Sequence, residues 1–205
     1  MTAPFDFDAL ERHLVAGCLE AIAIFAKQAP KGDPATIFAI DSNPYYGEFL
    51  PSFDTRSRTL AFIRGAQKQA LASRDWLEMK EKDAWAASYD GARACAVPMF
   101  NNEVGDFSHH MIHECPYDAL DAFARSPGYS KLNARAKPAA KKLGRTGNDY
   151  DGYIEGHTRA VLARVCDKLV VHGAFAKLEL ACPFGVGYAY HSEKVTICRV
   201  IIGSR

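Results

Sequence analysis

The chain has 205 residues, of which 48% are hydrophobic and 24% are charged, and its formal net charge at pH 7 is +1. This composition is typical of a globular protein with a hydrophobic core, and the nearly neutral charge argues against a dedicated nucleic-acid binder. No apolar run reaches the roughly 18–20 residues that a membrane-spanning helix needs. The first residues are acidic rather than basic, which is not typical of a signal peptide, and no CxxC pair is present. We therefore expect a cytoplasmic protein with reduced thiols, no membrane association and a single globular domain over residues 1–205.

The first part of the sequence predicts two helices separated by a pair of strands. Apolar residues recur at intervals of three or four between residues 6 and 29, which is typical of an amphipathic helix. Residues 36–54 are then predicted to form strand, turn and strand, because a short apolar run is followed by Asp41–Pro44 and a second aromatic run. Helical spacing returns over residues 57–73.

The second part predicts a short helix after Pro116, an irregular segment, a long helix and a C-terminal hairpin. Residues 129–152 are rich in basic residues and glycine, and we expect them to form a mobile segment. Residues 153–172 have helical spacing, and residues 186–202 are typical of two strands joined by a turn. Helices and strands alternate without regular βαβ spacing. We therefore predict an α+β fold, in which a mostly antiparallel sheet carries its helices on one face.

A histidine cluster is the most metal-like feature of the sequence. Residues 108–115 have the sequence Ser-His-His-Met-Ile-His-Glu-Cys, and His109 and His113 share a face in either a helix or a strand. With Glu114 or Cys115 they form a candidate site for zinc or a similar metal, because imidazole, carboxylate and thiolate groups are suitable ligands. The competing interpretation is ordinary histidines on a half-exposed element, since the HExxH order is absent. No cofactor is expected unless this cluster binds a metal.

No complete motif for nucleophilic catalysis is present in the sequence. Cys95, Cys115 and Cys182 are candidate nucleophiles only where the fold brings a histidine close, and Cys115 already has His113 nearby in sequence. Buried and unreactive cysteine is the commoner case. The catalytic residues of any reaction are therefore unknown at this point.

A run of positive charge extends from residue 122 to residue 148, where no acidic residue occurs. Clustered cations can bind phosphate, which makes Lys137, Lys141 and Lys142 candidate anion-binding residues. The competing interpretation is a solvated loop with no ligand.

Aromatic residues cluster where the first predicted strand turns into the second. Tyr45, Tyr46 and Phe49 are candidates for a surface that binds a protein partner, and Trp76 and Trp85 are possible additions to it. Aromatic side chains dominate the anchors of protein interfaces. The competing interpretation is that these side chains cover the hydrophobic core.

The order of these patterns resembles bacterial proteins grouped as domain-of-unknown-function family 4303. The resemblance rests on the leading helix, on Ile37–Asp41 continuing into a turn and a second strand, on the tryptophan-containing middle, and on the late helix. It implies a small bacterial α+β protein without an assigned reaction. By analogy with small families such as immunity proteins, we expect a non-enzymatic partner-binding or regulatory module. The alternative is a metal-dependent hydrolase or metal-binding protein based on His109 and His113.

Overall fold

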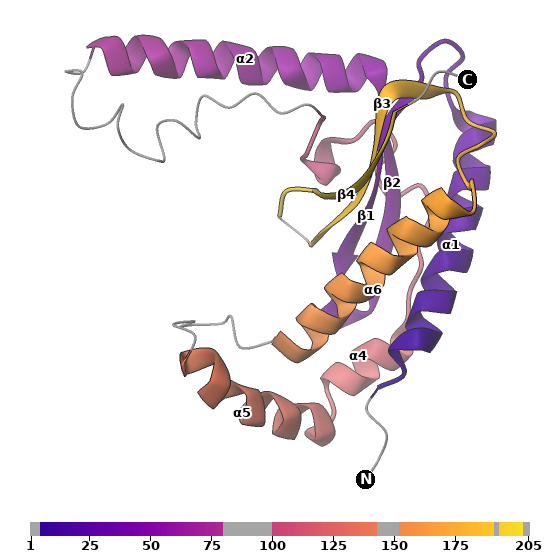
Figure 1. Ribbon diagram of the computed structural model, residues 1–205, viewed down its shortest axis with the longest axis vertical. Helices are drawn as coiled ribbons and strands as arrows, with labels where there is room; N and C mark the ends of the chain where they lie inside the picture. Colours follow the sequence, from indigo (N-terminus) through magenta and orange to yellow (C-terminus); the bar gives the residue numbers. More distant parts are fainter. Residues whose placement is uncertain (1–4, 80–99, 143–151, 191–192, 203–205) are drawn as a thin grey trace.

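A sheet of four strands and the helices on one of its faces form the body of the protein (Figure 1). The computed structural model describes residues 5–79, 100–142, 152–190 and 193–202, except for the side chains of residues 66, 69–79, 133, 136–142 and 152. The elements in chain order are α1 (Phe7–Gln28), β1 (Ala35–Asn43), the 3-10 helix η1 (Pro44–Tyr46), β2 (Glu48–Thr55), α2 (Arg56–Met79), the 3-10 helix η2 (Val104–Asp106), α4 (Asp118–Ala124), α5 (Pro127–Lys142), α6 (Gly152–Val171), β3 (Leu180–Tyr190) and β4 (Thr196–Ile201).

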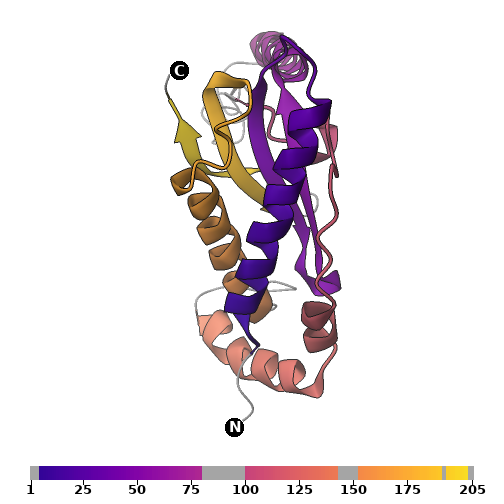
Figure 2. The ribbon, with the colours of Figure 1, turned by 90° about the vertical axis from the view of Figure 1, so that its right-hand side faces the viewer.

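The strand order is β2-β1-β3-β4, so two antiparallel hairpins meet in the middle of the sheet. The central pair, β1 and β3, is parallel. Helices α1 and α6 lie side by side across one face of this sheet (Figure 2). The predicted α+β class, the mostly antiparallel sheet with helices on one face and the C-terminal hairpin are all confirmed.

The main core lies between the sheet and the two long helices. The apolar stripe predicted for residues 6–29 faces the sheet, since Leu10, Leu14 and Cys18 are fully buried. Phenylalanines fill the space behind this stripe: the rings of Phe25 and Phe53 stack with their centroids 4.0 Å apart. Period-two alternation along β2 places Phe49 and Phe53 on the same inner face, and both are fully buried.

A buried carboxylate joins the two helices that cover the sheet. Glu11 of α1 is 6% exposed, and its carboxylate pairs with Arg164 and Lys168 of α6. Burial raises the pKa of Glu11, but hydrogen bonds from Lys168 and Arg164 outweigh burial and leave the pKa lowered. The charged form of Glu11 therefore contributes to the packing of α1 against α6.

We expect Glu11→Gln to lower the free energy of unfolding at pH 7 by about 1.5–3 kcal/mol, because a charge-assisted hydrogen bond is lost. Folding lowers the pKa of Glu11, so its contribution is complete above the pKa of an unfolded glutamate, about 4.3, and is lost as pH falls through the folded value. Urea unfolding of the wild type and of Glu11→Gln at several pH values measures the difference in their free energies of unfolding, which should shrink in acid. Glu20→Gln, on the exposed side of α1, is the matched control and should change stability by less than about 1 kcal/mol, the range for an exposed ion pair such as that of Glu20 with His113. A difference that stays constant down to the lowest pH would contradict this role of Glu11.

Two helices extend further than the sequence analysis predicted. Helix α2 continues to Met79, beyond the predicted end at residue 73, and it projects from one end of the sheet (Figure 1). Residues 127–142 form helix α5, so the prediction of an irregular segment is wrong for this part of residues 129–152. The sequence contains a signal for the start of this helix. The Ser126 hydroxyl accepts a hydrogen bond from the N–H of Tyr129, and Pro127 occupies the first helical position.

Several predictions concern residues that the structure does not describe. Residues 143–151, the glycine-rich part of the basic segment, are among them. Residues 80–99 also lie outside the described ranges, together with Trp85 and the candidate nucleophile Cys95. None of the helices that the structure describes is both long enough and apolar enough to cross a membrane.

Candidate functional site

The face of the sheet opposite the long helices is covered by residues 100–107. Ile37 and Ala39 of β1 point to this face and pack with Phe100, Val104 and Phe107. Because both faces of β1 are covered, this strand is buried along almost its whole length. Both faces of the sheet thus contribute to the core.

Asp54 holds this covering segment in place. Its carboxylate is fully buried and accepts hydrogen bonds from the Thr59 hydroxyl at 2.8 Å, from the Asn101 amide at 3.1 Å and from the Ser108 N–H at 3.0 Å. A buried carboxylate that accepts three hydrogen bonds has the environment of a structural group. Asp54 therefore anchors residues 101–108 against the sheet and the start of α2.

A cavity of about 350 Å³ lies at the other end of the same face, and carboxylates from three segments line it. Asp41 is 3% exposed, and its carboxylate lies 3.6 Å from Nε2 of His110. The remaining carboxylates have basic partners in the ion pairs Lys194–Glu103 (3.5 Å), Arg58–Asp106 (3.7 Å) and Arg159–Glu193 (3.0 Å). Because these acids are already paired, the cavity is not a strongly negative site.

The predicted histidine cluster lies in an irregular segment that turns at residues 110–111, and its members have different partners. The ring of His109 meets the ring of Phe25 edge to face at 5.0 Å. Nε2 of His113 lies 3.3 Å from a carboxylate oxygen of Glu20, whereas Glu114 lines a separate small cavity with Glu48. In the described part of the chain, no group of three or more His, Cys, Asp or Glu side chains is arranged to hold a metal ion. The metal-binding alternative gains no support from this geometry and stays a prediction.

Cys115 is not placed as a nucleophile. Its side chain is 3% exposed and packs against α1, where a Cβ atom added to Gly17 would lie 2.3 Å from its sulfur. Burial and the charge of Glu20 raise the pKa of Cys115 to about 12. Since the thiolate is the reactive form, this thiol is unreactive at neutral pH.

Of the three residues predicted to form the aromatic surface, one has an exposed ring. Tyr46 is 61% exposed on η1, and Tyr45 packs partly against the main core. The assignment of Phe49 to this surface is wrong, because its side chain is fully buried under α1. The side chains of Trp76 and Trp85 lie outside the described part of the structure.

The candidate anion-binding lysines lie on one helix. Lys137, Lys141 and Lys142 all belong to α5, whose backbone is described but whose side chains at these positions are not. Their anion-binding role therefore stays a prediction.

One edge of the sheet, that of β2, is covered by backbone from residues 109–117. The N–H groups of this segment donate to carbonyl oxygens along β2 and at Gly47, in the pairs His109–Phe53 (3.0 Å), Ile112–Pro51 (3.2 Å), Cys115–Phe49 (2.9 Å) and Tyr117–Gly47 (2.8 Å). The residues that were predicted to bind metal thus serve to close this edge. A covered edge cannot accept a further strand.

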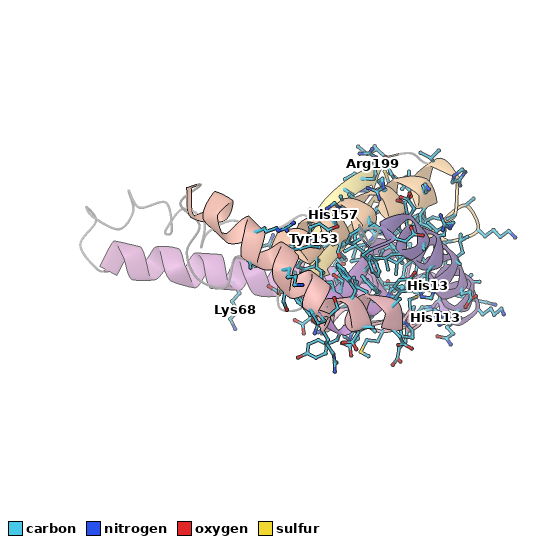
Figure 3. All side chains as sticks on the ribbon, turned by 90° about the horizontal axis from the view of Figure 1, so that it is seen from below. His13, Lys68, His113, Tyr153, His157 and Arg199 are labelled. Carbon is cyan, nitrogen blue, oxygen red and sulfur yellow. The ribbon has the colours of Figure 1, made fainter. Side chains whose placement is uncertain are left out.

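The opposite edge is formed by β4, and in the described part of the chain it is open. No strand or segment in the described ranges pairs with the outer side of β4. Figure 3 shows this arrangement from below, with Arg199 of β4 and His113 of the covering segment on opposite sides of the molecule. The guanidinium of Arg199 forms an ion pair with Asp167 of α6.

Apolar side chains lie along this open edge. Ile197 is 36% exposed and Val200 is 42% exposed, and Ile202, just beyond the strand, is 80% exposed. Ile197 and Val200 pair with Gly187 and Gly185 of β3. Because residues directly opposite share a face and glycine has no side chain, β3 offers nothing to cover Ile197 and Val200 there. The sequence analysis predicted the strand, but it contained no signal that this strand forms an edge.

Comparisons with known proteins do not add a relative to this description. No family model matches the chain, and no curated protein or solved structure is significantly similar to it.

Proposed function

We propose that this protein acts by binding a protein partner rather than by catalysing a reaction, and that the partner adds an extended segment to β4. The observation that carries the proposal is the uncovered edge of β4 with Ile197 and Val200 exposed on one face. A strand added to such an edge gains affinity from backbone hydrogen bonds and specificity from alternate side chains. The other edge, along β2, has no room for a strand, since residues 109–117 already occupy it.

The partner segment is proposed to be apolar at alternate positions and to come from a different protein. Two features of β4 oppose pairing with a second copy of this chain. A β-bulge at Cys198 interrupts the regular register, because Val186 pairs with Arg199 whereas Gly187 pairs with Ile197. Arg199 also brings a long cationic side chain to the edge, where its guanidinium is paired with Asp167 of α6. Bulges and edge cations are devices by which native sheets avoid pairing with themselves. We further expect the partner to carry no Lys or Arg opposite Arg199.

This proposal keeps the partner-binding role expected from the sequence and from the resemblance to family 4303. It moves the proposed surface away from Tyr45, Tyr46 and Phe49. A single exposed tyrosine offers a partner less contact area than an edge strand with two exposed aliphatic side chains and a third just beyond its end. An immunity-type role remains one form that such partner binding would take.

Selection of peptides from a random displayed library on the immobilised full-length protein tests this proposal. We expect the selected peptides to alternate apolar and polar residues, and to bind with dissociation constants in roughly the micromolar range, which corresponds to about −8 kcal/mol. Fluorescence anisotropy with labelled synthetic peptides measures the affinity. Failure to select any peptide, or selection of peptides without apolar alternation, would overturn the proposal.

The identity of the occupant is tested by sedimentation of the purified protein. If β4 binds a different protein, we expect this protein to sediment as a monomer at micromolar concentrations. A dimer that dissociates when Ile197 and Val200 are both replaced by lysine would assign the edge to a second copy and would refute the hetero-partner claim.

A further inference from the structure

Two cysteines from distant parts of the chain meet where α6 crosses the C-terminal hairpin. Cys166 is fully buried on α6, and its Sγ lies 3.4 Å from the carbonyl oxygen of Gly187, to which it donates a hydrogen bond. Gly187 pairs with Ile197, and Cys198 is the next residue along β4. Cys166 belongs to the main core cluster, and the partly buried Cys198 packs against the same cluster.

The β-bulge explains how Cys198 reaches the helix. Val186 and Gly187 are consecutive on β3, but their partners Arg199 and Ile197 are separated by Cys198. An extra residue in one strand bends that strand and re-aims its side chain. At this position Cys198 packs against the core cluster that contains Cys166, and it lies one residue from the partner of Gly187, whose carbonyl accepts the hydrogen bond from Cys166.

The two thiols differ in accessibility and in acidity. Cys198 is half-buried, whereas Cys166 is not exposed. The neighbouring Cys166 thiol lowers the pKa of Cys198, and the nearby charge of Arg199 acts in the same direction against burial and Asp167. The neighbouring Cys198 and burial raise the pKa of Cys166. Tyr188 also lies close to both thiols.

We propose that Cys198 and Cys166 form an oxidation site for small peroxides, in which Cys198 reacts first and Cys166 closes a disulfide bond. The site stands on the placement of the two cysteines in one core cluster beside Gly187, on the partial exposure of one thiol and on the burial of the other. A reactive, accessible thiol beside a resolving thiol is the usual arrangement of a reversible redox site. This inference is independent of whether β4 binds a partner.

The chemistry balances with one molecule of hydrogen peroxide. The Cys198 thiolate attacks one peroxide oxygen, the O–O bond breaks, and the released hydroxide takes up a proton to leave water and a sulfenic acid on Cys198. The sulfur of Cys166 then attacks the sulfenic sulfur, loses its proton and expels the hydroxyl group as a second water molecule. The two sulfur atoms are oxidised to a disulfide, and both peroxide oxygens are reduced to water.

Another neighbouring pair in the core is not suited to this reaction. Cys115 contributes to the raised pKa of Cys18, and both thiols are buried. Burial raises the pKa of both thiols, that of Cys115 to about 12. A thiol that is neither ionised nor accessible reacts slowly with peroxide. This pair therefore provides an internal comparison within the same molecule.

Peptide mapping after treatment of the folded protein with hydrogen peroxide tests the proposal. Trypsin should release residues 165–168 and 195–199 as separate peptides from the reduced protein. After peroxide we expect one cross-linked peptide that contains both, with the loss of the two thiol hydrogens, and dithiothreitol should restore the separate peptides. Cys115 should remain reduced, with an oxidation rate at least about 10-fold lower than that of Cys198.

Serine variants provide the controls. Cys182→Ser removes an exposed cysteine elsewhere and should leave the cross-link unchanged. Cys166→Ser should abolish the cross-link and leave a sulfenic acid on Cys198 that dimedone traps. Circular dichroism checks that the wild-type protein is folded. The proposal is overturned if this folded protein gives no cross-linked peptide and Cys198 either stays reduced or oxidises past the sulfenic acid.

Discussion

Replacing Phe53 by alanine is expected to lower the free energy of unfolding by about 3–5 kcal/mol, the range for truncating a fully buried phenylalanine. Phe53 is fully buried at the centre of the main core. Its ring stacks on Phe25 of α1 at a centroid distance of 4.0 Å and lies 4.9 Å from the ring of Phe38 on β1. Loss of this ring leaves a cavity between α1 and the sheet that neither can close without moving. Urea unfolding followed by circular dichroism measures the effect.

Tyr46→Ala is the matched control for this substitution. Its ring is 61% exposed, so its removal should change stability by no more than about 0.5 kcal/mol. A loss below about 1 kcal/mol for Phe53→Ala would contradict the position of this ring in the core. A large loss for Tyr46→Ala would contradict its exposure on η1.

Replacing both Ile197 and Val200 by lysine is expected to weaken the binding of a selected peptide by roughly 100-fold, or about 2.7 kcal/mol. The substitutions remove the apolar contacts of an added strand and place two charges where the strand would lie. Lysine on an edge strand is a common means of preventing such pairing. Anisotropy titration of the same labelled peptide against the wild type and the double variant measures the change.

Leu19→Lys is the control for surface charge. Leu19 is an apolar residue with 46% exposure on α1, which forms no part of the β4 edge. This variant should bind the peptide with the wild-type affinity. Circular dichroism checks that both proteins are folded. If the peptide then binds the wild type and the double variant with equal affinity, β4 is not the binding strand.

The helices and strands follow from local patterns, but the sheet order does not. Period-three-and-four spacing predicted α1 and α6 because each helix buries one continuous stripe. The parallel pairing of β1 with β3 depends on contacts between residues such as Phe38 and Val186, which lie far apart in sequence. Alternation within β2 indicates that Phe49 and Phe53 share a face, but only the folded structure shows that this face is buried.

The candidate sites could not be predicted from the sequence for a different reason. Residues 109–117 close one edge through backbone hydrogen bonds, which leave no trace in residue type. The exposure of Ile197 depends on its register with Gly187, a partner that only the folded hairpin defines. The placement of Cys198 near Cys166 likewise depends on a bulge in β4. Individual residue types were visible in the sequence, but their neighbours were not.

Amide hydrogen exchange of the full-length protein, with and without a selected peptide, tests the docking role of β4 most directly. Amides on the outer side of residues 196–201 have no backbone partner among the described residues, so they should exchange rapidly in the free protein. Peptide binding is predicted to slow their exchange and to leave residues 109–117 unchanged. Slower exchange around Tyr46, with no change in β4, would contradict the account and would return the binding surface to the turn between β1 and β2.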